Sequence, residues 1–484
     1  MKMTPELERA IGMWGIALCV LAAAAGWMFM RFGQAWSVAD LPESGNVVYI
    51  VPAYIISEIA MIPLGAKLAD MWGCKRAVLP GLFLFVVGAM LCVVSVSVEM
   101  LITFRLVMGL GGGLLLGLAF TSVGRYYEKG ARGKCHELMT AAFAIGSLFG
   151  TAVGYFFVEN FNWRMGFVIL SIAVMIGSAI AYRFLPRDQG EGVRMDPVNT
   201  VLVVALFGVA AFYSQEVNVD FELISWPSLA FIAVIVALLV AAMRNSKTSP
   251  NPLIPRGVTV MEKKMIFLMF AFSMCGLGLI QYFFKLYLVY YEFDIYVASM
   301  MFALLIAGAA GPSILGSRKV LKTGVRPWIV VGAVLVTVAL VLTHFIADKG
   351  VAQFGLSLFM FGLGLGCIVT QLIISLQSFT PREKMGQHTG NLMAVRMAGI
   401  VVGNAFVGAY MQEVKQSGHV TDVIDISATS DLLGSIAQHI LGEVSYAANA
   451  LNDGFTVSVV IMAVVTALLA VVAFTLGDDD KLQE

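Results

Sequence analysis

The stretch Gly65-Ala-Lys-Leu-Ala-Asp-Met-Trp-Gly-Cys-Lys-Arg76 connects two long apolar segments. Its two glycines permit a tight turn and a close approach of helices. Its aspartate can cap the N-terminus of a neighbouring helix and pair with a basic residue. The alternative interpretation is an ordinary basic cytoplasmic loop that follows the positive-inside rule. We interpret the stretch as a gating motif, formed by Gly65, Asp70, Gly73, Lys75 and Arg76.

The composition on both sides of this motif indicates a membrane protein. Of 484 residues, 59% are hydrophobic and 13% are charged, whereas soluble globular proteins carry about 25% charged residues. A soluble chain of this size has no single core large enough for so much apolar surface. The formal net charge is zero, so the totals predict no nucleic-acid partner. We therefore predict an all-α membrane protein whose main partner is the lipid bilayer.

Fourteen apolar runs have the length of about 20 residues that a helix needs to cross the hydrocarbon. The predicted spans are 12–35, 47–68, 78–98, 100–123, 138–158, 164–185, 198–215, 226–243, 265–290, 297–315, 328–347, 353–377, 388–411 and 455–476. The other connections are short, and the long one, 412–454, carries its own amphipathic stretch.

The distribution of basic residues predicts the orientation of these spans. If the N-terminus is cytoplasmic, the inner segments hold 24 of the 31 Lys and Arg residues, and the outer side holds three. One missed or invented span would mix the two sets, so the segregation supports the count of fourteen. We expect both termini in the cytoplasm and the protein in the plasma membrane. The first apolar run lacks a small-residue cleavage site, which predicts a retained span and not a signal peptide.

The motif at 65–76, placed after the second span, closely resembles the inner-loop signature of the major facilitator superfamily. The six-plus-two-plus-six arrangement of spans resembles the drug:proton antiporter branch of that family. This resemblance implies a six-helix bundle in residues 1–190, two extra helices in 191–260, and a second six-helix bundle in 261–484 with an outer loop at 412–454. The stretches 251–256, 362–366 and 381–386 agree with the same branch.

Two further motifs resemble the family less closely. Residues 101–109, which contain Arg105, resemble its Arg-containing motif, with Met108 where Gln is usual. The glycines of the fifth span resemble the drug-antiporter motif, with Thr151 where Pro is expected; small residues at this spacing also occur in ordinary helix packing. These helix-packing glycines are Gly146, Gly150 and Gly154. The first span departs from the branch, because residues 27–34 lack its acidic residue. The signature of fourteen-span peptide symporters, Glu-Glu-Arg, is also absent there.

Glu58 is the only carboxylate deep inside a predicted span. An ionisable group at the membrane centre is costly and is therefore a functional candidate. Burial and a nearby cation act on a carboxyl group in opposite directions, so a Glu between these effects can take up and release a proton. We interpret Glu58 as the proton-coupling residue. The alternative is a structural ion pair between Glu58 and Arg31.

Cationic and polar residues on several spans predict a binding site for an anion. By the family's pseudo-symmetry, spans one, four, nine and twelve line the central cavity. Three of the cations lie about one helical turn inside the outer boundary. The alternative for two of them is snorkelling of the side chain to the headgroups. The candidate substrate-binding residues are Arg31, Gln34, Tyr54, Arg105, Gln281, Lys285, Gln371 and Arg396.

Other titratable residues are assigned no functional role. His136 and Glu137 begin the fifth span and His388 begins the thirteenth, so we interpret all three as interfacial residues. The six cysteines show no disulfide or zinc spacing and are interpreted as reduced packing residues. The chain has no phosphate-binding loop, no His-Glu-x-x-His site and no Gly-x-Ser-x-Gly nucleophile. We therefore expect no enzyme activity, no cofactor and no metal.

These observations predict a secondary transporter. The expected function is proton-coupled export of small amphipathic, anionic molecules by a monomer, in the manner of a multidrug antiporter. The missing first-span acid and fifth-span proline leave an alternative, a transporter that takes up or exchanges organic anions. A second alternative is a membrane receptor or scaffold that carries nothing. The sequence leaves the substrate, the direction and the stoichiometry open.

Overall fold

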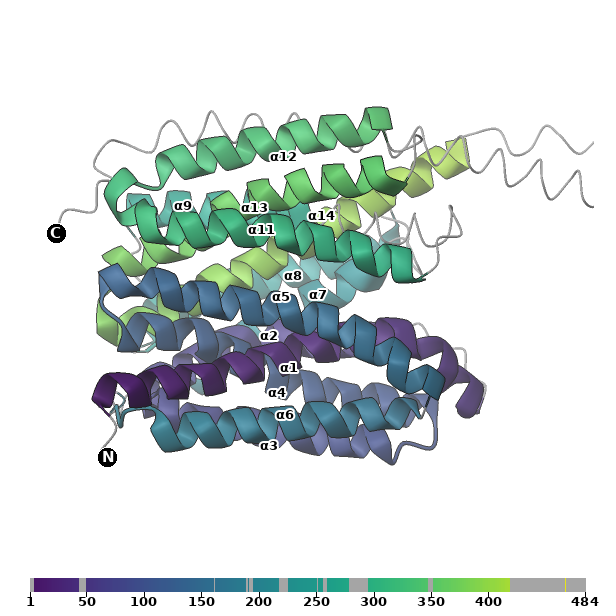
Figure 1. Cartoon of the computed structure of the whole chain (residues 1–484), viewed down its shortest axis with the longest axis horizontal. Helices are drawn as coiled ribbons and strands as arrows, with labels where there is room; N and C mark the ends of the chain where they lie inside the picture. The colour runs from purple at the N-terminus through teal and green to yellow at the C-terminus, as the bar shows by residue number, and fades with distance from the viewer. Residues whose placement is uncertain are drawn as a thin grey trace, which may run out of the picture.

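The computed structural model is all-helical over the residues that it describes, with no strand among them. These residues are 4–42, 49–160, 162–188, 190, 195–216, 225–249, 251–255, 259–277, 295–346, 351–417 and 466. The helices run roughly parallel and antiparallel to one another in two groups, one above the other in Figure 1.

The first group contains the helices from the N-terminal part of the chain (Figure 1). They are α1 (Pro5–Asp40), α2 (Ile50–Trp72), α3 (Cys74–Val93), α4 (Val98–Tyr126), α5 (Lys129–Asn160) and α6 (Trp163–Phe184). Short polar side chains define where some of them begin. Ser97 caps α4 by accepting from the Met100 amide at 3.2 Å, and Asn162 caps α6 by accepting from the Arg164 amide at 2.9 Å.

The second group contains the helices from the C-terminal part of the chain. They are α9 (Val260–Phe272), which continues as the π-helical turn η2 (Ser273–Leu277), α11 (Ile295–Thr323), α12 (Arg326–Ile346), α13 (Val351–Phe379) and α14 (Met385–Ser417), the last preceded by the 3₁₀ turn η4 (Arg382–Lys384). A capping box begins α9, in which Thr259 and Glu262 satisfy each other's backbone amides.

Two helices come between these groups in the sequence. They are α7 (Pro197–Glu216) and α8 (Trp226–Thr248). Helix α7 packs against α8, and also against α2 of the first group and α14 of the second. Much of α8 is exposed, which is the expected surface for a helix in contact with lipid.

Several pairs of helices join the first group to the second, among them α4 with α14 and α5 with α13. Helix α2 packs against α14, and α5 packs against α11. The cavity described below lies between the two groups.

Eight of the described helices contain a segment long and apolar enough to cross a membrane, by length and composition. Two more described segments, Leu304–Ser317 and Arg326–Leu342, are shorter and apolar. Several helices are longer than the predicted spans. Helix α5, for example, begins at Lys129, nine residues before the predicted 138. Its first residues are polar and contact other helices, so the helix begins before the apolar run. The part of the predicted span 265–290 after Leu277, and the predicted span 455–476 apart from Thr466, lie outside the described residues.

Close contacts within the first group occur at the glycines singled out in the sequence. A Cβ atom at Gly65 of α2 would collide with the backbone of Leu114 in α4. Cβ atoms at Gly146 and Gly150 of α5 would collide with backbone carbonyl groups of α1. Gly154 lies in the same helix, but its surroundings are outside the description. These glycines let backbones approach more closely than any other residue would allow.

Candidate functional site

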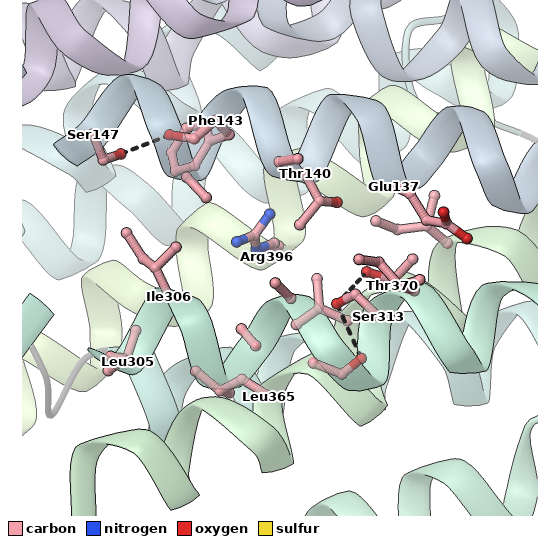
Figure 2. Close-up of a pocket in the computed structure, with 18 of the residues that line it drawn as sticks. Glu137, Thr140, Phe143, Ser147, Leu305, Ile306, Ser313, Leu365, Thr370 and Arg396 are labelled. Atoms are coloured by element: carbon pink, nitrogen blue, oxygen red, sulfur yellow. Dashed lines mark hydrogen bonds between the residues drawn. The ribbon is translucent and has the colours of Figure 1, made fainter. Parts of the chain in front are cut away.

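A cavity of about 180 Å³ lies between the two groups of helices. Residues of α1, α4 and α5 line one side, and residues of α11, α13 and α14 line the other. The wall is mainly apolar, with aromatic side chains from Trp27, Phe120 and Phe143. Hydroxyl groups of Ser313 and Thr370, which share a hydrogen bond of 3.2 Å, provide polar points on the far side (Figure 2). An apolar cavity with a few polar groups is the usual form of a small-molecule site.

Arg396 of α14 carries a positive charge to this cavity (Figure 2). Its Nε atom is buried and has no hydrogen-bond partner among the residues that the structure describes. The indole Nε1 of Trp27, also on the cavity wall, is likewise buried without an acceptor in the described part of the chain. Buried donors without partners are costly, so both atoms favour a ligand that brings hydrogen-bond acceptors.

Glu137 of α5 carries a negative charge to the same cavity (Figure 2). Its Oε1 accepts a hydrogen bond of 2.5 Å from Ser317 of α11, so the carboxylate connects the two groups of helices. The sequence places Glu137 at the membrane interface, whereas the structure places it more than one turn inside α5 and on the cavity wall. His136, also interpreted as interfacial, is fully buried.

Glu58, Tyr54 and Arg105 form a separate buried cluster within the first group. The Tyr54 hydroxyl donates to Glu58 Oε1 at 3.0 Å and lies 2.9 Å from the carbonyl oxygen of Ala23. Arg105 Nε donates to the carbonyl oxygen of Ile50 at 2.7 Å, and its guanidinium lies 5.1 Å from the Tyr54 ring centroid. None of these three side chains is among those lining the cavity. The sequence predicted one substrate site that contains Tyr54, Arg105 and Arg396. In the structure, Tyr54 and Arg105 lie in the buried cluster with Glu58, whereas Arg396 lies on the cavity wall.

The remaining candidate substrate residues are not resolved as one group. Gln371 of α13 is fully buried and donates to the carbonyl oxygen of Pro312 at 3.0 Å; it is not among the residues that line the cavity. Arg31 and Gln34 lie in the last turns of α1, but their side chains are outside the description. Gln281 and Lys285 lie outside the described residues. Of the four proposed residues whose side chains the structure describes, Arg396 is the one on this cavity.

The motif at 65–76 forms a junction between α2, α4 and α14. Asp70 accepts hydrogen bonds from the backbone amides of Gly386 and Gln387, at 2.9 and 2.8 Å, and so caps the N-terminus of α14. Arg125 of α4 pairs with Asp70 at 3.1 Å and with Asp188 at 3.3 Å. This arrangement ties the first group of helices to the second.

The basic end of the motif packs within the first group. Gly73 has a φ of 79°, a conformation that favours glycine, and forms the turn between α2 and α3. Lys75 donates to the carbonyl oxygen of Leu185 at 3.2 Å and lies over the ring of Tyr182. Arg76 is exposed.

A second junction is centred on Gln377 near the end of α13. Its amide nitrogen donates to the carbonyl oxygen of Phe120 and to Thr389, both at 3.1 Å. Its amide oxygen lies 2.8 Å from Nε2 of His136, and Arg132 donates to its backbone carbonyl. Gln377 thus connects α13 and α14 with α4 and α5. No motif in the sequence marked this residue.

Trp27 and Glu137 are two of the site residues that the sequence reasoning missed. Trp27 precedes Arg31 by one helical turn on the same predicted span, so a search along that face would have found it. Glu137 was harder to predict as a site residue, because it follows a basic loop in the sequence, where the end of a membrane span is expected. The long-range pairing of α5 with α11 that brings it to the cavity is not readable from local sequence.

Comparisons with known proteins agree with this architecture. The profile described as Major Facilitator Superfamily matches residues 16–404. Multidrug transporter protein MdtP of Bacillus subtilis (strain 168) is 24% identical over 427 residues, covering 85% of this chain and 77% of that protein. Methylenomycin A resistance protein of the same strain is 28% identical over 275 residues, covering 53% of this chain and 56% of that protein.

A solved structure shares the fold. The proton:xylose symporter XylE, bound to 6-bromo-6-deoxy-D-glucose, superposes with a TM-score of 0.65 at 12% identity, covering 98% of this chain and 96% of that one. Eight of the described helices have the length and apolar composition of membrane spans, as expected of an integral membrane protein. The chain belongs to the Major Facilitator Superfamily, as the motif at 65–76 predicts, and it is a transporter and not an enzyme.

Proposed function

We propose that this protein exports small amphipathic organic anions in exchange for protons, by alternating access. The observation that carries the proposal is the apolar cavity with two buried, unpartnered donors, Arg396 Nε and Trp27 Nε1. A carboxylate or sulfonate would satisfy both donors, and the apolar body of the molecule would pack on the aromatic wall. The names of the two Bacillus relatives, which refer to multidrug transport and resistance, support the direction of export.

We further propose that Glu58 exchanges the proton. It is 5% exposed, and its described hydrogen-bond donor is the neutral Tyr54 hydroxyl. A carboxyl group in such surroundings can bind and release a proton as water gains access. Glu58 contacts Tyr54, Tyr54 contacts the α1 backbone at Ala23, and α1 carries Trp27 one turn later. This path connects proton binding with the cavity.

The alternating-access part of the proposal assigns the Asp70 and Gln377 junctions to the gate. Both connect the first group of helices to the second, so both must separate if the groups rock apart. We propose that the chain has fourteen spans, acts as a monomer and inserts in the plasma membrane with both termini in the cytoplasm. This orientation would put both junctions on the cytoplasmic side. The segregation of basic residues supports this orientation.

Transport by purified protein in liposomes tests the proposal. The probe is Nα-dansyl-norleucine, a fluorescent amphipathic carboxylate, with a trapped pH dye reporting proton movement. Under an imposed proton gradient the wild type should move the probe against the proton flux. Glu58→Gln should lose gradient-driven transport and keep probe exchange. Arg396→Gln should lose both by at least about tenfold, which corresponds to 1.4 kcal/mol, and the exposed Arg183→Gln should match the wild type.

Other outcomes identify the alternative functions. Probe and proton movement in the same direction, or probe exchange without proton movement in the wild type, would establish uptake or exchange of organic anions. Saturable binding without flux under any gradient would establish a receptor or scaffold. If Glu58→Gln retains full gradient-driven transport, the proton is carried elsewhere.

A further inference from the structure

His136 of α5 lies at the contact between the two groups of helices and is fully buried. Its Nε2 atom lies 2.8 Å from the amide oxygen of Gln377 in α13, so the imidazole belongs to the Gln377 junction. Its Nδ1 atom is buried and has no hydrogen-bond partner in the described part of the chain. The proposed transport cycle uses Glu58 for the proton and leaves this second buried titratable group without a role.

The neighbours of Gln377 determine which nitrogen of His136 carries the hydrogen. The Gln377 amide nitrogen donates to the carbonyl oxygen of Phe120, which can only accept, and to Thr389, both at 3.1 Å. The amide oxygen of Gln377 therefore faces His136 and accepts from an Nε2–H group. In the neutral imidazole, Nδ1 then carries only a lone pair.

A second proton on His136 does not fit this closed arrangement. It would place an N–H group at Nδ1 with no acceptor among the described residues, and a positive charge on a fully buried ring. Both are costly in a buried site. Arg132, about one turn earlier on α5, is a cation whose field also opposes that charge. Its guanidinium donates to the carbonyl oxygens of Gly124 and Gln377 and is thereby held in place.

The other elements packed around the imidazole do not balance a positive charge on it. Helix α4 presents the neutral ring of Phe120, stacked at 6.2 Å between centroids, and α13 presents the neutral Gln377. Helix α1 brings a further cation, Arg9, to the same end of α5. The carboxylate of Glu137, the next residue along α5, is engaged with Ser317 of α11. The closed junction therefore favours the neutral imidazole.

We propose that His136 is a second proton-binding site and that its protonation from the cytoplasm opens the Gln377 junction. When the groups separate, the imidazole leaves Gln377 and becomes hydrated, so both of its nitrogens can carry a hydrogen. The proton binds the separated arrangement better than the closed one and shifts the equilibrium toward it. The inference rests on the proposed function only in treating this junction as part of a cytoplasmic gate. An acidified cytoplasm then favours the arrangement that admits substrate from that side.

Distances between two spin labels in detergent, without substrate, test the inference. The labels attach to Arg183→Cys in the first group and Lys322→Cys in the second, both exposed positions. Labelling is done at pH 8, where the closed arrangement keeps the native cysteines buried. A hydrated histidine has a pKa of about 6.5, so a proton that binds only the separated arrangement should raise the ratio of separated to closed molecules about tenfold between pH 7.5 and pH 5.5.

Three variants assign this pH dependence to one residue. His136→Gln keeps a neutral N–H donor for Gln377 and should give the same ratio at both pH values. Glu58→Gln should keep the pH dependence of the wild type, as should His388→Gln, which alters the other buried histidine in the described part of the chain. In the wild type itself, deuterium exchange at Cε1 of each imidazole, read by mass spectrometry, should show that His136 gains a proton as the groups separate.

Several results would overturn the inference. A ratio that does not change with pH in the wild type would do so, as would a pH dependence that persists in His136→Gln or is lost in Glu58→Gln. Separation of the groups while His136 gains no proton would also contradict it. Its failure is distinguishable from that of the proposed function. Coupled flux in liposomes with a pH-independent ratio would leave export standing, whereas acid-driven separation without flux would leave the His136 site standing.

Discussion

Asp40 and Arg164 form an ion pair between the ends of two helices, α1 and α6. Asp40 lies beyond the apolar segment Pro5–Met30 of α1 and also accepts from Trp163 Nε1 at 3.1 Å. The Arg164 guanidinium, with a smaller effect from Trp163, holds the pKa of Asp40 below its usual value. Because the Asp40 side chain is 49% exposed, the pair is expected to contribute less than about 1 kcal/mol.

The depressed pKa gives this contribution a defined pH dependence. It is fully present above the unfolded pKa of about 3.9 and is lost as the pH falls through the folded value. We expect Asp40→Asn to lower the melting temperature in detergent slightly at pH 7, and the difference from wild type to shrink below about pH 4 and vanish once the pH is below the folded pKa of Asp40. A difference that persists unchanged at low pH would show that the charge of Asp40 does not stabilise the fold.

Arg105 is a second residue whose contacts allow a sharp prediction. It is fully buried, and its Nε and guanidinium fork donate to the backbone of α2 at Ile50 and of α1 at Gly26. Lysine lacks the fork and would leave at least one of these buried carbonyl groups without a donor. We expect Arg105→Lys to cost about 1–3 kcal/mol of stability, measured as a lower melting temperature, with the exposed Arg183→Lys as the control. Full stability combined with lost transport would indicate a role in coupling instead.

At the scale of single elements, the capping of α14 by Asp70 is the contact with the clearest consequence. Its two oxygens accept from the Gly386 and Gln387 amides, and Asp70 also pairs with Arg125. The negative charge at the N-terminus of α14 is favourable, as is usual for helix termini. Asparagine offers one acceptor oxygen in place of two and has no charge.

We expect Asp70→Asn to expose the first turn of α14 to solvent. Hydrogen exchange of the amides at residues 386–390, followed by mass spectrometry, should be at least about tenfold faster than in the wild type, equivalent to 1.4 kcal/mol of lost protection. Exchange in α3 should not change. Arg76→Gln, in the same motif but exposed, provides the matched control. Unchanged exchange at 386–390 would mean that the cap does not hold this helix end.

The helices themselves were largely predictable from the sequence, whereas their contacts were not. Apolar runs predicted segments such as α2 and α4 because the bilayer sets a minimum length for a span. The motif at 65–76 also predicted a capping role for Asp70, since its chemistry is local. Glu137 and Gln377 gain their roles from pairs of helices more than 170 residues apart in the chain. Neither periodicity nor composition records such long-range pairing.

Considered as a whole molecule, the structure holds the two groups of helices together through at least two junctions, at Asp70 and at Gln377. The second junction is the better test of rocking, because the Gln377 side chain reaches α4, α5 and α14 at once. Gln377→Ala removes two contacts between the groups, to Phe120 and His136, and one within the second group, to Thr389. Since several buried polar groups lose their partners together, we expect the closed arrangement to lose about 2–4 kcal/mol relative to one in which the groups separate.

A cysteine placed between the groups reports that separation. Ser317 of α11 is 3% exposed and faces Glu137 of α5, so Ser317→Cys is a nearly isosteric reporter. Alkylation of Cys at position 317 by a water-soluble maleimide should be at least about tenfold faster when Gln377→Ala is also present. The native Cys19 and Cys92, fully buried in the first group, serve as internal controls in the same digest. Faster labelling of all three would indicate unfolding, whereas unchanged labelling at 317 would exclude Gln377 from the barrier, because only separation of the two groups exposes that position while the first group stays packed.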